Sequence, residues 1–244
     1  MRVLPHEIDF AKFLLLVGDG TLNDQRDNLF LPEHCILKNN DIVRTVFQQL
    51  IIDKKFDIMS KCAILSARNI DVDELNKSVI DLLDRSTEHI YTGIDSTENC
   101  DNGEFDEVLL PEYLNSLNPS SLPPHELRLR KNCIVMLIRN ISIHEGLCNG
   151  TRLRVLDFSK HLLKCEVLAG DKSNNIVFLN RISLFCINEY PFTFKRRQFS
   201  VKLAFAMKIN KAQGQTFENI AIVLRRDVFN HGQLYVAMSY DEEI

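Results

Sequence analysis

The feature that most constrains the fold is a pair of apolar runs, each followed at once by a polar turn. Val201–Met207 alternates large and small apolar residues, and Ile220–Leu224 is the second run. Runs of this length between polar turns predict strands buried on both faces. Polar residues fill Ile209–Thr216 after the first run, and a short helix over 231–239, capped by Asn230, is predicted after the second. Two such junctions predict an α/β sheet, and ligand sites favour these junctions.

The first junction contains the groups needed to hold a phosphate-bearing ligand. Lys211 supplies positive charge, Gln213 and Thr216 supply hydrogen bonds, and Gly214 allows a backbone to approach closely. An ordinary exposed turn between two core strands would use the same residue types. On the residues alone, both interpretations stay open.

The upstream elements also fit an α/β fold. Apolar residues at helical spacing predict helices over 6–17, 42–52 and 71–83, and Asp71 is predicted to cap the last of these. An apolar run predicts a buried strand over 61–66. A strand, a loop and a helix in this order predict the start of an α/β lobe.

The middle of the chain changes character. Residues 85–108 are polar and acidic, and they are expected to form a mobile surface insertion or linker. Downstream, short strands alternate with turn material that includes Asn149-Gly150. Five strands with tight turns predict a small β-barrel. Their expected ranges are 133–138, 152–158, 162–168, 176–179 and 182–186.

Charge is distributed unevenly along the chain. Residues 1–120 hold 11 Lys and Arg against 22 Asp and Glu, whereas residues 121–244 hold 18 against 11. A basic half is suited to a polyanion such as nucleic acid. Attraction between two oppositely charged lobes, or ordinary solvated faces, would produce the same division.

A basic triplet, Lys195 to Arg197, precedes the first apolar run. Together with the lysines that follow it, the triplet is a candidate groove for a phosphodiester backbone, and a solvated basic loop is the alternative. Aromatic residues interleave with these charges, and they suit either base stacking or the core. They are Phe192, Phe194 and Phe199, and the lysines are Lys202, Lys208 and Lys211.

Seven cysteines and seven histidines show neither a CxxC pair nor finger-like spacing, so no zinc site is predicted. An odd number of scattered cysteines fits reduced thiols, and Cys62 and Cys133 lie within apolar runs and are expected in the core. No apolar run reaches the length of a membrane span, and the first residues lack a signal-peptide pattern. We therefore expect a nuclear or cytoplasmic protein that is not secreted.

Five stretches resemble the Pif (petite integration frequency) family of superfamily-one DNA helicases, and the wording is closest to the helicases encoded by Helitron transposons. The two most specific are INKAQGQT at 209–216 and HGQLYVAMS at 231–239. The others are FAKFLLLVGDG at 10–20, LPPHELRLRKNCIVMLIRNISIHEGLCNGTRL at 122–153 and PFTFKRRQFSVKLAFAM at 191–207.

The resemblance implies two RecA-like lobes with DNA across them and ATP between them. For this chain it implies an α/β fold: a RecA-like second helicase lobe with an inserted small Src-homology-like β-barrel, preceded by the tail of a first RecA-like lobe. The expected limits are 1–55 for the helical tail and linker, 56–124 with 191–244 for the second lobe, and 125–190 for the barrel.

The resemblance also implies site residues. Arg68, in the phrase SARN, occupies a place similar to that of a basic residue facing the γ-phosphate, and an arginine suits that role because it is always charged and binds bidentately. A solvent-facing loop arginine is the alternative. Gly214 and Gln215 are the other implied nucleotide-binding residues. The implied contacts to single-stranded DNA are Lys195, Arg197, Lys208, Asn210, Lys211, Gln213, Thr216, His231, Gln233 and Tyr235.

The chain departs from the family pattern in three respects. It has no GxxxxGK[ST] and no apolar strand ending in Asp-Glu, so half of the site for ATP and Mg²⁺ of a complete relative is missing. Tyr240 stands where the family has its arginine finger, whose loss costs on the order of a thousandfold in rate. Lys208 replaces a threonine. We therefore expect no catalytic residue in this chain, no tight binding of ATP or Mg²⁺ and no unaided ATP hydrolysis.

Two functions remain as expectations. The first is the C-terminal part of a Pif-like, ATP-dependent 5′–3′ DNA helicase that binds single-stranded DNA, with a first RecA-like lobe supplied by a longer product. The second is a non-catalytic DNA-binding or scaffold module without the motor. An upstream lobe containing GxxxxGK[ST] would discriminate between them.

Overall fold

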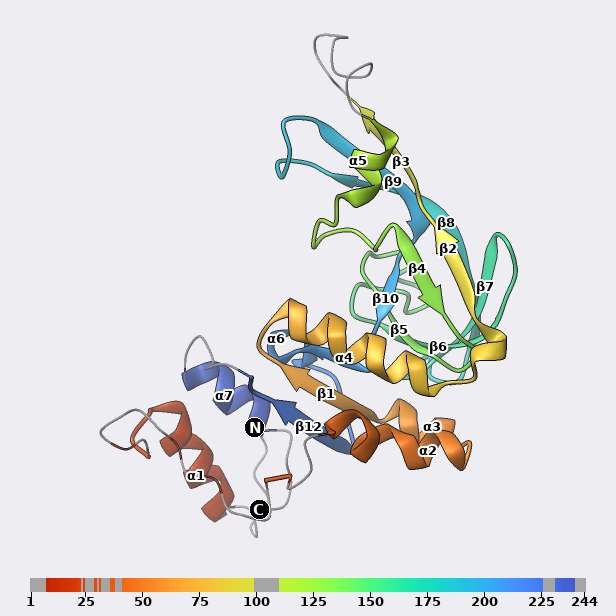
Figure 1. The fold of residues 1–244 in the computed structure, drawn as a ribbon. Helices are drawn as coiled ribbons and strands as arrows, with labels where there is room; N and C mark the ends of the chain where they lie inside the picture. The colour runs from red at the N-terminus through yellow and green to blue at the C-terminus, as the bar shows by residue number, and fades with distance from the viewer. Residues whose placement is uncertain are drawn as a thin grey trace. The chain divides into compact units, whose positions relative to one another are not determined.

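A computed structural model describes residues 8–22, 24, 29, 31, 36–37, 41–98, 110–225 and 231–239. The chain forms two compact units (Figure 1). Unit 1 comprises Met1–Val79 and Phe205–Ile244, and unit 2 comprises Ile80–Ala204. Unit 1 is therefore built from two separate segments of the chain, whereas unit 2 is continuous.

A three-stranded parallel sheet lies at the centre of unit 1. Its strands are ordered β11 (Ala206–Lys208), β1 (Cys62–Ser66) and β12 (Asn219–Val223). All five residues of β1 are buried, as its uninterrupted apolar run predicted. The strands predicted over 61–66 and 220–224 are confirmed.

Helices accompany this sheet in the order expected from apolar spacing. The helices predicted over 6–17, 42–52 and 71–83 are confirmed, and the second contains a π-helical segment, η2. Phe47 of η2 packs edge-on against Phe205, with ring centroids 5.5 Å apart. The bounds are α1 Ile8–Gly18, η2 Arg44–Gln48, α2 Gln49–Ile52, α3 Phe56–Ser60, α4 Asn69–Leu82, α6 Ile209–Ala212 and α7 His231–Met238.

Unit 2 is built around a seven-stranded antiparallel sheet in the order β10-β5-β6-β7-β8-β9-β3, and β2 and β4 form a separate pair. The bounds are η3 Arg85–Thr87, β2 His89–Thr92, β3 Ile94–Glu98, α5 Pro111–Ser116, β4 Glu126–Leu129, β5 Ile134–Leu137, β6 Arg152–Phe158, β7 Leu162–Val167, β8 Ile176–Cys186, β9 Thr193–Phe199 and β10 Val201–Leu203.

Strand β8 makes the large sheet curl. Its first half pairs with β7 and its second half pairs with β9, so two sections of sheet share one strand of 11 residues. The strands predicted separately over 176–179 and 182–186 are therefore one element. The α/β fold class with a curled, barrel-like sheet inserted in the chain is confirmed.

The single strand expected over 201–207 is wrong. β10 ends at Leu203 and pairs with β5 in unit 2, whereas β11 begins at Ala206 and pairs with β1 in unit 1. Both segments are apolar because both are buried, so the run gave no sign that the chain changes sheets between them.

The surface insertion expected over 85–108 is wrong for residues 85–98, which form η3, β2 and β3; residues 99–109 lie outside the described part of the chain. Tyr91 of β2 and the side chain of Asp95 of β3 are buried, whereas most other side chains of these strands are polar and outward-facing. Unit 2 therefore includes more of the chain than the barrel expected at 125–190.

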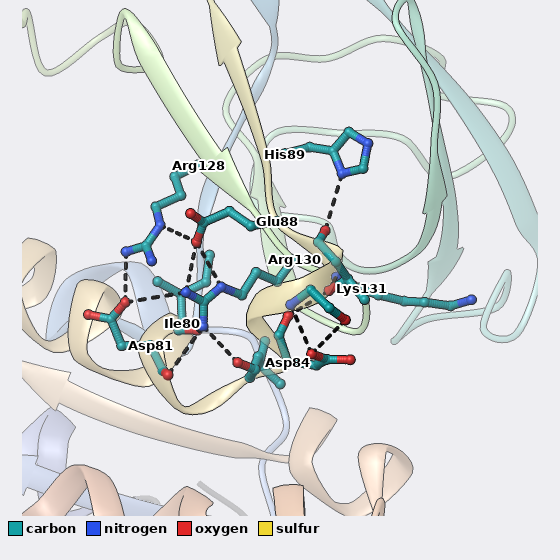
Figure 2. Close-up of polar contacts among 11 residues, drawn as sticks. Ile80, Asp81, Asp84, Glu88, His89, Arg128, Arg130 and Lys131 are labelled. Carbon is teal, nitrogen blue, oxygen red and sulfur yellow. Dashed lines mark hydrogen bonds and ion pairs between the residues drawn. The ribbon is translucent and has the colours of Figure 1, made fainter.

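A buried arginine in unit 2, Arg130, caps the C-terminal end of α4 (Figure 2). The Arg130 side chain is 2% exposed and donates hydrogen bonds to the backbone oxygens of Ile80 at 2.8 Å and Leu83 at 2.6 Å. It also pairs with Glu88 at 2.7 Å, and hydrogen bonding to Arg130 lowers the pKa of that carboxyl group. Arg130 thereby satisfies carbonyls that a helix end leaves without partners.

A second buried arginine, Arg196, ties β9 to β3. Its guanidinium donates to both carboxylate oxygens of Asp95, at 2.7 and 2.8 Å, and to the Pro123 carbonyl at 3.0 Å. His125 Nδ1 lies 2.8 Å from the same carboxylate. The middle residue of the predicted basic triplet is therefore part of the core, and Phe192, Phe194 and Phe199 are core residues as well.

Candidate nucleic-acid interface

The candidate site lies at the carboxyl edge of the parallel sheet in unit 1. Ser66 at the end of β1 is in register with Lys208 at the end of β11 and with Val223 at the end of β12. Because the strands are parallel, the segments that follow all three begin at the same edge. Arg68, α6 and Arg225 belong to these segments.

Arg68 is held by an acidic neighbour on α4. Its Nε and Nη2 donate to the two carboxylate oxygens of Asp71 at 2.8 and 2.9 Å. These hydrogen bonds raise the pKa of the guanidinium, so Arg68 stays cationic. Asp71 lies inside the first turn of α4, not before it, so the predicted cap at Asp71 is wrong; its carboxylate serves Arg68 instead.

Arg225 joins this charged group and was missed in the sequence analysis. It pairs with Glu74 of α4, and its Nη1 lies 3.7 Å from Asp71. The sequence feature that could have identified Arg225 is its position directly after the second apolar run.

Ser66 also belongs to the edge. Its side chain is buried, and its Oγ has no hydrogen-bond partner within the described structure.

Helix α6 presents its polar residues to solvent because its apolar residues are anchored. Ile209 and Ala212 are buried, whereas Asn210 and Lys211 are exposed. After the helix, Gln213, Gly214 and Thr216 are exposed and Gln215 is half-buried. The INKAQGQT stretch is thus a short helix and turn whose outer groups are amides, a hydroxyl and one ammonium, which are suited to phosphate oxygens.

The turn after α6 depends on a glycine. Gly214 has φ +80°, a left-handed conformation that residues with a Cβ rarely adopt, although a Cβ there would meet no atom within 4 Å. The Gln215 amide donates to the Lys211 carbonyl at 3.3 Å, which folds the turn back onto α6.

A buried amide fixes the start of β11. Asn76 of α4 is 4% exposed and accepts hydrogen bonds from the backbone N–H groups of Phe205 at 3.0 Å and Ala206 at 2.9 Å. Its Nδ2 donates to the Ala206 carbonyl at 2.9 Å. Asn76 therefore fixes the position from which β11 and α6 run to the edge. A polar residue within a helical pattern gave no indication of this role in the sequence.

Helix α7 contributes fewer exposed groups than the motif HGQLYVAMS implied. Gln233 is buried, and Tyr235 is half-buried against α1, where a Cβ at Gly18 would lie 3.3 Å from its ring. The side chain of His231 and the whole of Tyr240 lie outside the described residues. Tyr235 accordingly has a packing role whatever else it contacts.

The remaining predicted DNA contacts, Lys195 and Arg197, belong to unit 2. Both lie on β9 with their side chains on the outer face, and Lys195 pairs with Glu98. Lys208, half-buried at the end of β11, belongs to the unit 1 edge. Within the described ranges, no three His, Cys, Asp or Glu side chains are grouped as a metal site, and no helix has the length and apolar character to cross a membrane.

Comparison with known proteins places these observations in a family context. Residues 112–158 match the family model for the 2B domain of DNA helicase Pif1. The chain is 32% identical over 136 residues to ATP-dependent DNA helicase PIF1 of Xenopus laevis, and 33% identical over 132 residues to that of Homo sapiens. Each match covers 53% of this chain and 20% of the relative.

Solved structures show the same fold. The Pif1 helicase from Candida albicans matches 95% of this chain and 51% of its own with a TM-score of 0.59 and 20% identity. Bacteroides Pif1 bound to ssDNA matches 82% of this chain and 45% of its own with a TM-score of 0.53 and 19% identity. The chain thus spans about a fifth of the length of the curated relatives and about half of the solved chains. The resemblance to Pif helicases is therefore confirmed: the chain has the fold of part of a Pif1 helicase, and about half of it is similar in sequence to ATP-dependent DNA helicases of that name.

Proposed function

We propose that the carboxyl edge of unit 1 binds single-stranded DNA as part of a Pif-like, ATP-dependent 5′–3′ helicase. The observation that carries the proposal is the register of the parallel sheet, which brings Arg68, α6 and Arg225 to one edge. The proposed DNA contacts of unit 1 are Lys208, Asn210, Lys211, Gln213, Thr216, His231, Gln233 and Tyr235.

The nucleotide would be contacted at the same edge by a different group of residues. Arg68 is the proposed phosphate ligand, and Gly214 and Gln215 lie in the turn that follows the neighbouring strand. The curated relatives are named as ATP-dependent, and one solved relative is described in complex with ADP-AlF3 and ssDNA. A longer product would supply the first RecA-like lobe and the remaining groups for ATP and Mg²⁺. Membership of the Helitron branch and a nuclear or cytoplasmic location belong to the same proposal.

The proposal is tested by fluorescence anisotropy of the full chain with a labelled single-stranded oligonucleotide at several salt concentrations. Binding should weaken steeply with salt, because phosphate contacts release counterions. Lys211→Ala should lower affinity and reduce the salt slope by about one. Lys77→Ala is the matched control, because Lys77 is an exposed lysine of α4 in the same unit.

A folded chain that fails to bind, or equal losses from Lys211→Ala and Lys77→Ala, would contradict the proposed interface. Circular dichroism of each variant separates lost contacts from lost folding.

The second candidate function is a DNA-binding or scaffold module that does not use ATP. The observation that favours it is the bidentate pairing of Arg68 with Asp71, which engages two guanidinium nitrogens internally. Steady-state ATP hydrolysis by a longer product that carries an upstream GxxxxGK[ST] lobe, measured with saturating single-stranded DNA, distinguishes the two: the module predicts no hydrolysis and unchanged DNA affinity when ATP is added. Arg68→Ala should leave DNA binding largely intact if Arg68 serves the nucleotide, and a large loss of DNA affinity would contradict that assignment.

A further inference from the structure

The two arginines of the unit 1 edge converge on a single carboxylate oxygen. Arg68 Nη2 lies 2.9 Å from Oδ1 of Asp71, and Arg225 Nη1 lies 3.7 Å from the same atom. Both positions follow from the pairing of β1 with β12, because each arginine lies two residues beyond one member of the registered pair Ser66 and Val223. The edge therefore contains a point at which two guanidinium groups hold one anionic oxygen.

Both guanidinium groups keep hydrogen-bond donors for a further partner. A guanidinium group has five N–H donors. The contacts of Arg68 within the described structure use Nε and Nη2, and those of Arg225 use Nη1. The Arg68 side chain is 30% exposed and the Arg225 side chain is 48% exposed, so an anion in solution can reach both.

The two acidic partners of these arginines differ in burial. Asp71 and Glu74 lie three residues apart on one face of α4. The Asp71 side chain is 3% exposed, and because a buried carboxylate needs its cations, it stays paired and orients the arginines. The Glu74 side chain is 55% exposed and pairs with Arg225 in solvent, where an ion pair contributes little. Glu74 is therefore the partner that a stronger anion would replace.

We propose that Arg225 is a second ligand for a terminal phosphate group at the unit 1 edge, placed beside Arg68 by Asp71 and occupied by Glu74 until the phosphate binds. A terminal phosphate carries a charge of about −1.5 to −2 and three acceptor oxygens, which suits two guanidinium groups. Each phosphodiester of DNA carries one negative charge. The inference rests on the proposed function, because it deepens the nucleotide contact proposed for Arg68.

Inorganic tripolyphosphate is the probe, because it presents terminal phosphates without a base or a sugar. A ³¹P NMR titration with the full chain measures its affinity from the terminal-phosphate resonance. Arg225→Ala should weaken binding about tenfold or more, the effect of losing a charge-assisted hydrogen bond. Arg44→Ala is the matched control, because Arg44 of η2 is an exposed arginine of unit 1 that also pairs with an aspartate, Asp41.

Removal of the exposed acidic partner should have the opposite effect. Glu74→Gln should strengthen tripolyphosphate binding about 1.5- to 5-fold, the range for an exposed ion pair. Asp73→Asn is the matched control, because Asp73 is exposed on α4 and makes no ion pair with any residue that the structure describes. Equal affinities for Glu74→Gln and Asp73→Asn would contradict the occupation of Arg225 by Glu74.

Anisotropy titrations with single-stranded DNA separate the two sources of phosphate. Arg225→Ala should lower tripolyphosphate affinity by a larger factor than DNA affinity. The reverse order would overturn the inference, because Arg225 would then contact the DNA backbone. Failure of both the unmodified chain and Glu74→Gln to bind tripolyphosphate would also overturn it, whereas DNA binding that depends on Lys211 would leave the proposed DNA interface standing. Circular dichroism of each variant excludes lost folding as the cause.

Discussion

Arg196 and Arg197 are adjacent in the chain, yet β9 places them in opposite environments. Arg196 is fully buried and its charge is met by Asp95, whereas Arg197 is exposed on the outer face. A buried charge that loses its partner keeps the cost of desolvation, while an exposed charge retains water. The two neighbours should therefore respond very differently to substitution.

Arg196→Met should lower the free energy of unfolding by about 3–5 kcal/mol, because it leaves the Asp95 carboxylate buried without its cation. Arg197→Ala should stay within about 0.5 kcal/mol of the unmodified chain. Urea denaturation followed by circular dichroism measures both. Similar losses of unfolding free energy from the two variants would contradict this prediction, because the buried ion pair with Asp95 would then not distinguish Arg196 from Arg197.

Burial of Cys133 gives the stability of unit 2 a dependence on alkaline pH. Removal from water raises the pKa of this thiol from 9.0 to about 12, so the folded chain favours the neutral form. The resulting stabilisation is complete below about pH 9 and is lost as pH rises from there toward about 12. Unfolding free energies between about pH 8 and about pH 10 should fall more for the unmodified chain than for Cys133→Val. Parallel pH profiles for the two would contradict the assignment.

Among the elements, β11 depends on a single side chain from another element. Asn76→Ala would leave the N–H groups of Phe205 and Ala206 buried without partners, at a cost of about 1–3 kcal/mol for each unsatisfied group. Since α6 follows β11 directly, DNA affinity should fall as well. Ser78→Ala is the control, because Ser78 is exposed on the same helix and its hydroxyl donates to the Glu74 carbonyl within that helix. Unfolding and anisotropy titrations of both variants measure the effect.

The turn that ends α6 offers a second test at the element scale. Gly214→Ala introduces a Cβ at φ +80°, where the strain is conformational and not steric because the space around it is open. The loss should be about 1 kcal/mol or slightly more, and it should weaken DNA binding by altering the turn before Thr216. Gly170→Ala is the comparison, because Gly170 has φ +85° and equally open surroundings in a different turn, in unit 2. Equal losses of DNA affinity from Gly214→Ala and Gly170→Ala would show that the turn after α6 has no specific part in DNA binding.

The sequence predicted elements whose signal is local. The apolar run of β1 and the helical spacing of α4 and α1 depend only on neighbouring residues, so they were found within two residues of their observed limits. The pairing of β3 with β9 was missed because the two strands lie about a hundred residues apart in the chain. Their polar side chains are explained only by that pairing.

The same distinction applies to the site. Its motifs place Lys211 in a short exposed helix and Thr216 in the turn after it, as expected for a turn or helix start. The pairing of Arg68 with Asp71 is local, three residues along the chain, whereas the participation of Arg225 required the pairing of β1 with β12, which a single sequence does not specify. The burial of Arg196 between two outward-facing neighbours on β9 likewise follows from pairing with β3 and not from the basic triplet itself.

At the scale of the whole molecule, the two units should lose protection from hydrogen exchange separately. Arg196→Met removes an ion pair that lies wholly within unit 2, so exchange should accelerate in peptides covering β3, β9 and α5. Peptides covering β1 and the start of α4 should keep the rates of the unmodified chain. Uniform acceleration in both groups would show that the chain unfolds as one cooperative body.

The middle position of β1 has a consequence for synthesis of the chain. Both of its hydrogen-bonding neighbours, β11 and β12, begin only after Ala204, so all of unit 2 leaves the ribosome before either neighbour exists. Unit 2 is continuous and can complete its sheet first. Meanwhile the apolar strand β1, CAILS, remains unpaired along both of its edges. A nascent chain paused between residues 80 and 204 would thus display an aggregation-prone strand. Chaperone binding to the first segment of unit 1 should decline only when β11 and β12 have been made.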